Sequence, residues 1–326
     1  MSTLYAFGGN PKRFFSVSAA ASTTDGENWN TLVQPFAELG QVQAVTRSSN
    51  TWVALSSQNQ FATSPDLQNW TAFDPENRIW LIRNVLWGNN HYLAVGMEKN
   101  LTDLTESAVV LVSYSGTEST WYRTYSTEFD NTMLYDAALL GNNTWVVVGG
   151  EDQTQPLMLW SQDQGLNWTR ILLPSYLNSA ITSVQYDLAS NTIWVGGRGW
   201  IATGIWQAAS TQWSVNDAIL DEGVARPVTR IFYAAQRSQP LVLAISGSSQ
   251  FASVNGVDWT STSWPGYRLG DVTCYYNSVL GQNVIYTSTW GMLNQYTAFV
   301  GVQAADGSLT HTGRNWGISA QRWFVV

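Results

Sequence analysis

The sequence predicts an all-β fold: a seven-bladed β-propeller with four strands in each blade. Two observations carry this prediction. A polar turn followed by tryptophan recurs along the whole chain, and short runs typical of β-strands stand between its copies. The closing tryptophans lie 41 to 57 residues apart, which is the spacing of one blade per repeat. They are Trp29, Trp70, Trp121, Trp168, Trp213, Trp259 and Trp316. A single propeller domain is therefore expected over residues 1–326.

The recurring turn has a mechanical reason. Its clearest copies each contain a small polar residue, an Asp or Asn, often a Gly, and then Trp. Asp can accept hydrogen bonds from nearby backbone amides, and Gly accepts a positive φ, so the motif suits a tight turn between two strands. The clear copies are 22–29, 63–70, 161–168 and 253–259, and weaker copies are 113–121, 203–213 and 310–316.

The rest of a blade can be placed around each turn. Two β-like runs joined by a short Asn or Gly turn precede it, as in 41–55, 82–96 and 135–150. We expect these to be strands A and B, counted outward from the propeller axis. Strand C then leads into the polar turn, and the tryptophan opens the outermost strand D.

The two ends of the chain fit a closure of the ring. Residues 318–326 have the pattern of a strand A with no strand B after it, and residues 3–9 that of a strand B with no strand A before it. Pairing these segments would complete one blade from both termini. It would also remove exposed sheet edges, which favour aggregation.

The charge of the chain limits its partners. Charged residues make up only 12%, the net charge is −8, and the only lysines are Lys12 and Lys99. Nucleic acids and anionic membranes need a basic surface, so neither is expected as a partner. We find no signal peptide and no apolar run of 18 residues, which predicts a cytoplasmic or non-classically secreted protein. The single cysteine, Cys274, excludes an intrachain disulfide.

The polar turn resembles the Asp-box, or BNR repeat, of sialidases, sortilin-type receptors, xyloglucan hydrolases and photosystem-assembly propellers. The resemblance covers the whole chain and implies the fold, but these families have unrelated functions. The turns lie on the C–D connections, opposite the usual binding face, so we expect them to be structural. In length, blade count and composition the chain also resembles the soluble propeller proteins of mushrooms. These include propeller lectins and the pink chromoprotein, which implies a non-covalent chromophore as a possible cofactor.

A column of polar residues is expected along the axis. When the A strands are aligned through their Asn turns, one position is polar in all seven copies. Two arginines and an aspartate there can hold an anionic or strongly polar group. The alternative is a solvated tunnel wall with structural Arg–Asp pairing. The column contains Gln43, Arg83, Asp136, Ser183, Arg230, Thr273 and Gln321.

Aromatic residues are expected at the tunnel mouth, where the D–A and B–C loops emerge. Large aromatic side chains are costly when exposed on loops, so a cluster indicates a ligand that stacks on them, either a planar ring or a sugar face. The alternative is that they pack between the loops and cap the core. The D–A candidates are Phe73, Trp80, Phe129, Tyr176, Trp264 and Tyr267, and the B–C candidates are Trp200, Trp290 and Tyr296.

A hard cation is a further candidate ligand of the axis. Ca²⁺ and Mg²⁺ prefer oxygen ligands, which Asp136 and Asp271 can supply. Arg83 and Arg230 would repel a cation at their own level. We therefore expect either an anion beside the arginines or a cation at another depth near the acidic residues.

Catalytic signals are few. No cluster has metal-ligand spacing and no nucleophile or nucleotide motif occurs, while Asp74, Glu76, Asp221 and Glu222 are acidic loop residues only. The B–C loops differ in length and content, which favours one unique site over seven equivalent ones. We therefore expect a non-catalytic protein that holds one aromatic or pigment-like molecule at the tunnel mouth. The alternatives are a carbohydrate-binding lectin and a glycoside hydrolase.

Overall fold

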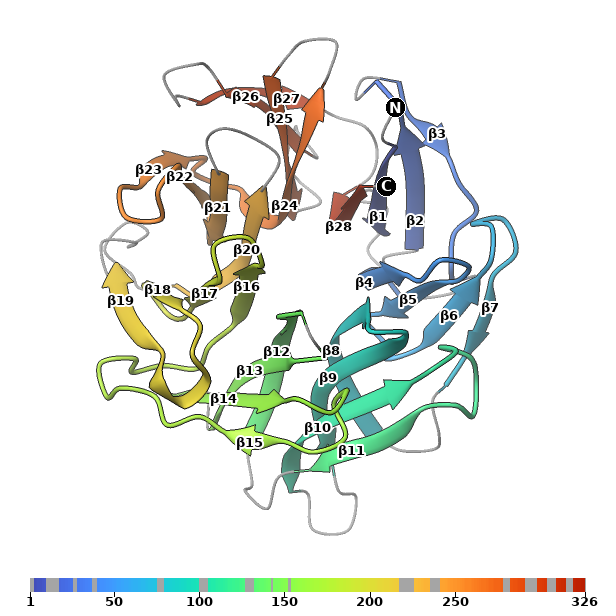
Figure 1. Cartoon of the computed structure of the whole chain (residues 1–326). Helices are drawn as coiled ribbons and strands as arrows, with labels where there is room; N and C mark the ends of the chain where they lie inside the picture. Colours follow the sequence, from blue (N-terminus) through green and yellow to red (C-terminus); the bar gives the residue numbers. More distant parts are fainter. Residues whose placement is uncertain are drawn as a thin grey trace.

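The computed structural model describes residues 3–9, 18–25, 28–36, 40–74, 79–99, 105–126, 132–141, 143–151, 154–216, 226–234, 241–277, 282–290, 298–303, 309–314 and 319–325. These residues form seven four-stranded antiparallel sheets arranged as blades around a common axis (Figure 1). The predicted seven-bladed β-propeller is thereby confirmed. Among the described residues, no helix is long and apolar enough to span a membrane.

The blades are numbered along the chain and their strands are given from the axis outward. Blade 1 contains β28 (Ser319–Val325), β1 (Leu4–Gly9), β2 (Ser18–Thr23) and β3 (Asn30–Thr31). Blade 2 contains β4 (Val42–Arg47), β5 (Trp52–Ser56), β6 (Phe61–Ser64) and β7 (Thr71–Phe73). Blade 3 contains β8 (Ile79–Gly88), β9 (His91–Lys99), β10 (Glu106–Ser113) and β11 (Tyr122–Ser126). Blade 4 contains β12 (Thr132–Leu139), β13 (Trp145–Glu151), β14 (Gln155–Ser161) and β15 (Thr169–Arg170).

The remaining three blades follow the same order. Blade 5 contains β16 (Ser183–Asp187), β17 (Thr192–Gly196), β18 (Ile201–Ile205) and β19 (Gln212–Asn216), with a 3₁₀ turn η1 (Ala208–Ser210) before β19. Blade 6 contains β20 (Val228–Ala234), β21 (Leu241–Ser246), β22 (Ser249–Ser253) and β23 (Thr260–Ser263). Blade 7 contains β24 (Arg268–Asn277), β25 (Gln282–Trp290), β26 (Ala298–Gln303) and β27 (Leu309–Arg314).

The ring is closed by strands from both ends of the chain. β28 pairs antiparallel with β1, from Leu4 opposite Val325 to Gly9 opposite Ser319. Each innermost strand contacts the innermost strand of the next blade, and β28 contacts both β24 and β4. Both termini therefore lie in one blade, as Figure 1 shows. The predicted closure is confirmed.

The hydrophobic core lies between the blades. Phe61 and Phe73 of blade 2 form one cluster with Trp121, which precedes the outermost strand of blade 3. The rings of Phe61 and Trp121 are 4.7 Å apart. Closing tryptophans thus fill the gap to the preceding blade, and apolar burial of this kind is the main force that holds neighbouring sheets together.

The polar turns join strands C and D. In the copy after β6, Ser64 Oγ donates to Asp66 Oδ1 at 3.3 Å, and the backbone N–H of Asn69 donates to the same oxygen at 2.9 Å. The amide of Asn69 donates to Asp66 Oδ2 at 2.8 Å. One turn position needs a positive φ, which glycine adopts without strain. It is held by Leu67, Gly116, Gly165 and Gly256.

One predicted turn is wrong. Residues 310–316 were expected to form the seventh copy, but Thr310 to Arg314 belong to β27, the outermost strand of blade 7. The C–D connection of that blade lies between Gln303 and Leu309. Tryptophan therefore marks the beginning of strand D in the first six turns, whereas Trp316 follows the end of β27 in the sequence.

Acid is expected to weaken the polar turn of blade 2. Hydrogen bonds from the backbone N–H groups of Asn69 and Gln68 lower the pKa of Asp66 to about 2. Because the folded pKa lies below the unfolded value of 3.8, this carboxylate stabilises the fold above about pH 4 and loses its effect as pH falls towards 2. Asp66→Asn should flatten the pH dependence of the unfolding free energy in that window. Urea titrations between pH 2 and 6 measure it, and the exposed Asp74→Asn is the control; equal slopes for both variants would contradict the prediction.

Candidate functional site

The structure divides the predicted axial column into two sets. Gln43, Arg83 and Gln321 each occupy a β-bulge, an extra residue in strand A that pairs with no single residue of strand B. Asp136 and Arg230 lie one residue later and are in register with strand B, opposite Val148 and Ile245. The alignment of seven equivalent positions is therefore wrong. A bulge shifts the register by one residue without leaving a mark in the hydrophobic pattern.

Gln43 and Arg83 are half-buried. Gln43 Nε2 donates to the carbonyl oxygen of Arg83 at 3.2 Å, which links blades 2 and 3. Arg83 Nε donates to Met133 Sδ at 3.3 Å. In blade 4 the bulge contains Tyr135, whose pKa is raised by burial and lowered to a smaller degree by the charge of Arg83.

A buried polar belt centred on Asp136 ties several blades together. Asp136 Oδ1 accepts from Asn84 Nδ2 of blade 3 at 2.6 Å. Its Oδ2 accepts from Ser183 Oγ at 3.2 Å and from the Val184 N–H at 3.0 Å, both in blade 5. Ser183 Oγ in turn accepts from the Ile231 N–H of blade 6 at 2.9 Å. The belt therefore crosses four consecutive blades.

The two arginines of the predicted column have different partners. Arg83 lies in blade 3, whereas Arg230 lies in blade 6 and forms an ion pair with the buried Asp271 of blade 7, Nε to Oδ1 at 3.1 Å. This contact is close but not aligned as a hydrogen bond. Thr273 lies two residues beyond Asp271 and is buried. The alternative of structural Arg–Asp pairing describes this part of the axis.

The predicted cation site is not supported. The carboxylate of Asp136 also accepts from the Ala137 N–H at 2.9 Å, so both of its oxygens are occupied by protein donors. Asp271 faces the positive charge of Arg230. Within the described ranges, no three His, Cys, Asp or Glu side chains gather as a metal-binding group.

Several predicted mouth aromatics belong to the core instead. Trp80 is in β8, is 3% exposed and packs in the cluster between blades 2 and 3. Trp264 stacks on Phe299 at 4.5 Å, and Tyr267 meets Phe299 edge-on at 5.2 Å. The expectation of a shared aromatic mouth is wrong for these residues, because they fill the gaps between blades. Trp290 ends β25, and its side chain lies outside the described residues, as do Phe129 and Tyr296.

Two of the predicted loop aromatics do meet. Tyr176, from the connection between β15 and β16, and Trp200, from the connection between β17 and β18, line one cavity of about 450 Å³ with Trp213. Tyr176 donates its hydroxyl hydrogen to the carbonyl oxygen of Trp213 at 3.1 Å. Asn178 and Val215 complete the lining, and we name this cavity the aromatic pocket.

The aromatic pocket has a rigid floor. Trp200 is 4% exposed, and its indole N–H donates to Ser179 Oγ at 3.1 Å. The same oxygen accepts from the Arg198 N–H at 2.8 Å. Gly197 has no side chain, and a Cβ there would overlap the indole of Trp200. Tyr176 is half exposed, so the pocket combines a fixed aromatic floor with an accessible aromatic wall.

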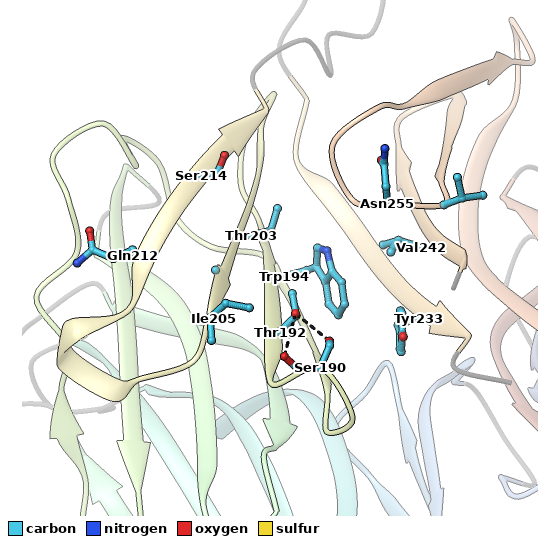
Figure 2. Close-up of a pocket in the computed structure, with 12 residues that line it drawn as sticks. Ser190, Thr192, Trp194, Thr203, Ile205, Gln212, Ser214, Tyr233, Val242 and Asn255 are labelled. Atoms are coloured by element: carbon cyan, nitrogen blue, oxygen red, sulfur yellow. Dashed lines mark hydrogen bonds between the residues drawn. The ribbon is translucent and has the colours of Figure 1, made fainter. Parts of the chain in front are cut away.

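A second cavity, of about 440 Å³, lies between blades 5 and 6, and we name it the interblade slot (Figure 2). Trp194 and Tyr233 stack within it at 4.9 Å, with an angle of 22° between the rings. Tyr233 donates to the buried Asp187; burial and this bond raise the pKa of Tyr233 to about 12. The slot is lined by Ser190, Thr192, Trp194, Thr203, Gly204, Ile205, Gln212, Ser214, Tyr233, Val242, Val254 and Asn255.

Sequence reasoning missed the slot and the role of Trp213. Trp213 was assigned to the repeat as a closing tryptophan, although it also lines the aromatic pocket. Of the acidic candidates, Asp74 is exposed, and Glu76, Asp221 and Glu222 lie outside the described residues. Glycoside hydrolysis therefore stays an untested prediction.

His311 is on β27, where burial lowers its pKa to about 4.

Comparisons with known proteins give the fold. No protein-family model matches the chain, and no curated protein matches it. Among solved structures it is similar to the periplasmic gluconolactonase PpgL of Pseudomonas aeruginosa, with a TM-score of 0.69 at 7% identity over 100% of this chain and 99% of that one. It is also similar to YCF48 from Cyanidioschyzon merolae, with a TM-score of 0.55 at 16% identity over 96% and 95%. The C-terminal WD40 domain of Sif2 gives a TM-score of 0.55 at 12% identity over 93% and 78%. At these identities the likeness extends to the propeller architecture and no further.

Proposed function

We propose that this chain is a non-catalytic binding protein that holds one planar, uncharged aromatic or pigment-like molecule in the aromatic pocket. The observation that carries the proposal is the convergence of Tyr176, Trp200 and Trp213 on one cavity of about 450 Å³. Cavities of this size, with mainly apolar walls and a few polar groups, are typical of small-molecule sites. The proposed site lies at blade 5 and not at the axis.

The lining defines the ligand class. None of the five lining residues is Asp, Glu, Lys, Arg or His, so a charged ligand would gain no ion pair there. The indole N–H of Trp200 already donates to Ser179 Oγ, so Trp200 offers a ligand only apolar surface. A planar ring can stack on the exposed Tyr176, and such contacts contribute about 0.5–1.5 kcal/mol beyond area burial. The exposed amide of Asn178 can bond a carbonyl or hydroxyl at the rim.

The similar solved structures are compatible with a binding role, but they do not favour it over another function. One is a gluconolactonase and another is YCF48 bound to D1 peptide, so the same architecture occurs both in an enzyme and in a peptide complex. Function on such a fold depends on the local site. We therefore base the proposal on the pocket.

Two measurements test the proposal. Protein purified from its native source should show visible or near-ultraviolet absorption from a co-purifying aromatic compound, identified by mass analysis. Protein freed of that compound should bind it, and Tyr176→Ala should weaken binding about tenfold, since about 1.4 kcal/mol of stacking is lost. Tyr114→Ala, a similarly exposed tyrosine of blade 3, is the matched control. A colourless protein with no bound compound, or equal affinities for the two variants, would contradict the proposal.

A further inference from the structure

The interblade slot lies where strand B of blade 6 has a smaller side chain than the corresponding strands of blades 2, 3 and 4. Near the start of strand B, blades 2, 3 and 4 have Trp52, Tyr92 and Trp145. Each is paired with the last serine of strand C and packs towards the preceding blade. Val242 holds this position in blade 6, paired with Ser253. A small side chain therefore stands where three other blades have a large aromatic ring.

The opposite wall does not fill the lost volume. Trp194 of β17 faces the slot from blade 5, stacks on Tyr233 and shares one hydrophobic cluster with Val242, and the slot remains open beside them. Figure 2 shows the indole between the strands of the two blades, with Tyr233 and Val242 on the far side. Close-packed interiors seldom leave such volume, so the substitution opens a space for a ligand.

The lining of the slot is rich in neutral hydrogen-bonding groups. Four Ser or Thr hydroxyls, the hydroxyl of Tyr233 and two amides line it, and none of its twelve residues is Asp, Glu, Lys, Arg or His. Thr203 and Ser214 are cross-strand partners on β18 and β19, so their hydroxyls lie side by side. In the described part of the chain these two hydroxyls have no side-chain hydrogen bond. They are available to a ligand that brings several donors and acceptors.

A buried donor supplies a second, independent observation. Trp194 is 5% exposed, and its Nε1 has no hydrogen-bond partner among the described residues. A Cβ placed on Gly256 would lie 3.2 Å from this nitrogen, so the N–H lies beneath the polar turn of blade 6. A buried donor without an acceptor costs about 1–3 kcal/mol, which a ligand oxygen at this edge of the slot would recover.

We propose that the interblade slot is a second binding site, for a neutral polyhydroxylated ring of the pyranose sugar class. Such a ring has a face of C–H groups, which fits the apolar surface of Trp194, Ile205 and Val254. Its edge carries hydroxyls that donate to and accept from Thr203 and Ser214. A flat aromatic ligand would leave these hydroxyls without partners, and an ionised ligand would meet no counter-charge.

The slot and the aromatic pocket are separate sites on one strand. Side chains alternate along β19: Gln212 and Ser214 line the slot, whereas Trp213 and Val215 line the aromatic pocket. Occupation of the slot thus does not need the aromatic pocket. The proposal stands or fails independently of the proposed function.

Methyl glycosides of glucose, galactose, mannose, fucose and N-acetylglucosamine test the site by saturation-transfer NMR and calorimetry. We expect at least one to bind the wild type with millimolar or better affinity. Val242→Tyr restores the ring found at Tyr92 and should abolish binding while leaving the circular dichroism spectrum unchanged. Thr203→Val combined with Ser214→Ala should weaken binding at least tenfold. Thr169→Ala removes the equivalent strand-D hydroxyl of blade 4, opposite Trp160, and should change nothing.

The outcomes separate the two proposals. If no glycoside binds the wild type, or if Val242→Tyr and the double variant bind as the wild type does, the slot is not a sugar site. If Val242→Tyr does not fold, the double variant alone decides, because it changes only small side chains. Loss of glycoside binding with retained binding of the aromatic compound would support the slot and leave the aromatic pocket intact.

Discussion

Gly149→Ala is expected to destabilise the propeller by about 3 kcal/mol or more, because an overpacked backbone contact cannot be relieved by a rotamer change. Gly149 pairs with Leu134 at the bulge of blade 4. A Cβ on Gly149 would overlap the carbonyl oxygen of Met133 and lie 2.9 Å from Leu134 Cα. Relief would require strands A and B of this blade to separate. Equilibrium urea unfolding measures the loss.

Gly96→Ala should behave in the same way, since its Cβ would overlap the carbonyl oxygen of Leu81 in blade 3. The matched control is Ser56→Ala. Ser56 holds the paired position in blade 2, opposite Val42, and already has a Cβ. It should lose only the hydroxyl that accepts from the N–H groups of Gln58 and Gln60, which is worth about 1 kcal/mol. A glycine variant as stable as this control would contradict the close approach of the strands.

Asp136→Ala should have an effect of similar size by a different mechanism. The change leaves Asn84 Nδ2, Ser183 Oγ and the Val184 N–H without their acceptor. Each buried donor without a partner costs about 1–3 kcal/mol, so the unfolding free energy should fall by about 3 kcal/mol or more. Because the donors come from blades 3 and 5, the loss affects contacts on both sides of blade 4.

Gln43→Ala provides the comparison for Asp136. Gln43 also links two blades through a side chain of an innermost strand: its amide nitrogen donates to the carbonyl oxygen of Arg83 at 3.2 Å, and the residue is half-buried and uncharged. Its removal should cost about 1 kcal/mol. Hydrogen exchange should show wider loss of protection in blades 3 to 5 for Asp136→Ala than for Gln43→Ala. Equal stabilities of the two variants would mean that the belt does not hold the blades together.

The fold could be predicted from the sequence because the repeat is visible at several positions in each copy. Tryptophans such as Trp70 and Trp168 mark the beginning of strand D, and the terminal segments lack one strand each. The exception was blade 7. There the predicted turn was placed before Trp316, whereas the connection between strands C and D begins after Gln303. There the spacing from Trp259 is also the longest, 57 residues.

The site could be predicted only in part, for geometric reasons. Tyr176 and Trp200 were expected on neighbouring loops and do meet, because D–A and B–C connections emerge on one face. Arg83 occupies a bulge, whereas Asp136 follows one and is paired with strand B. Bulges of this kind are defined by backbone pairing and not by residue type, so the sequence did not reveal them. The slot depends on Val242 being smaller than its counterparts, which becomes visible only when the strand register of each blade is known.

Closure through β28 and β1 has a consequence during protein synthesis. β28 is made about 310 residues after β1, although the two are hydrogen-bonded neighbours. At about 5–20 residues per second this interval lasts roughly 15–60 s. Throughout it the inner edge of β1 has no strand to pair with, and exposed strand edges promote association between chains. The nascent chain is thus an open arc that passes most of its translation time before the ring can shut, and this interval is when it would gain most from a chaperone.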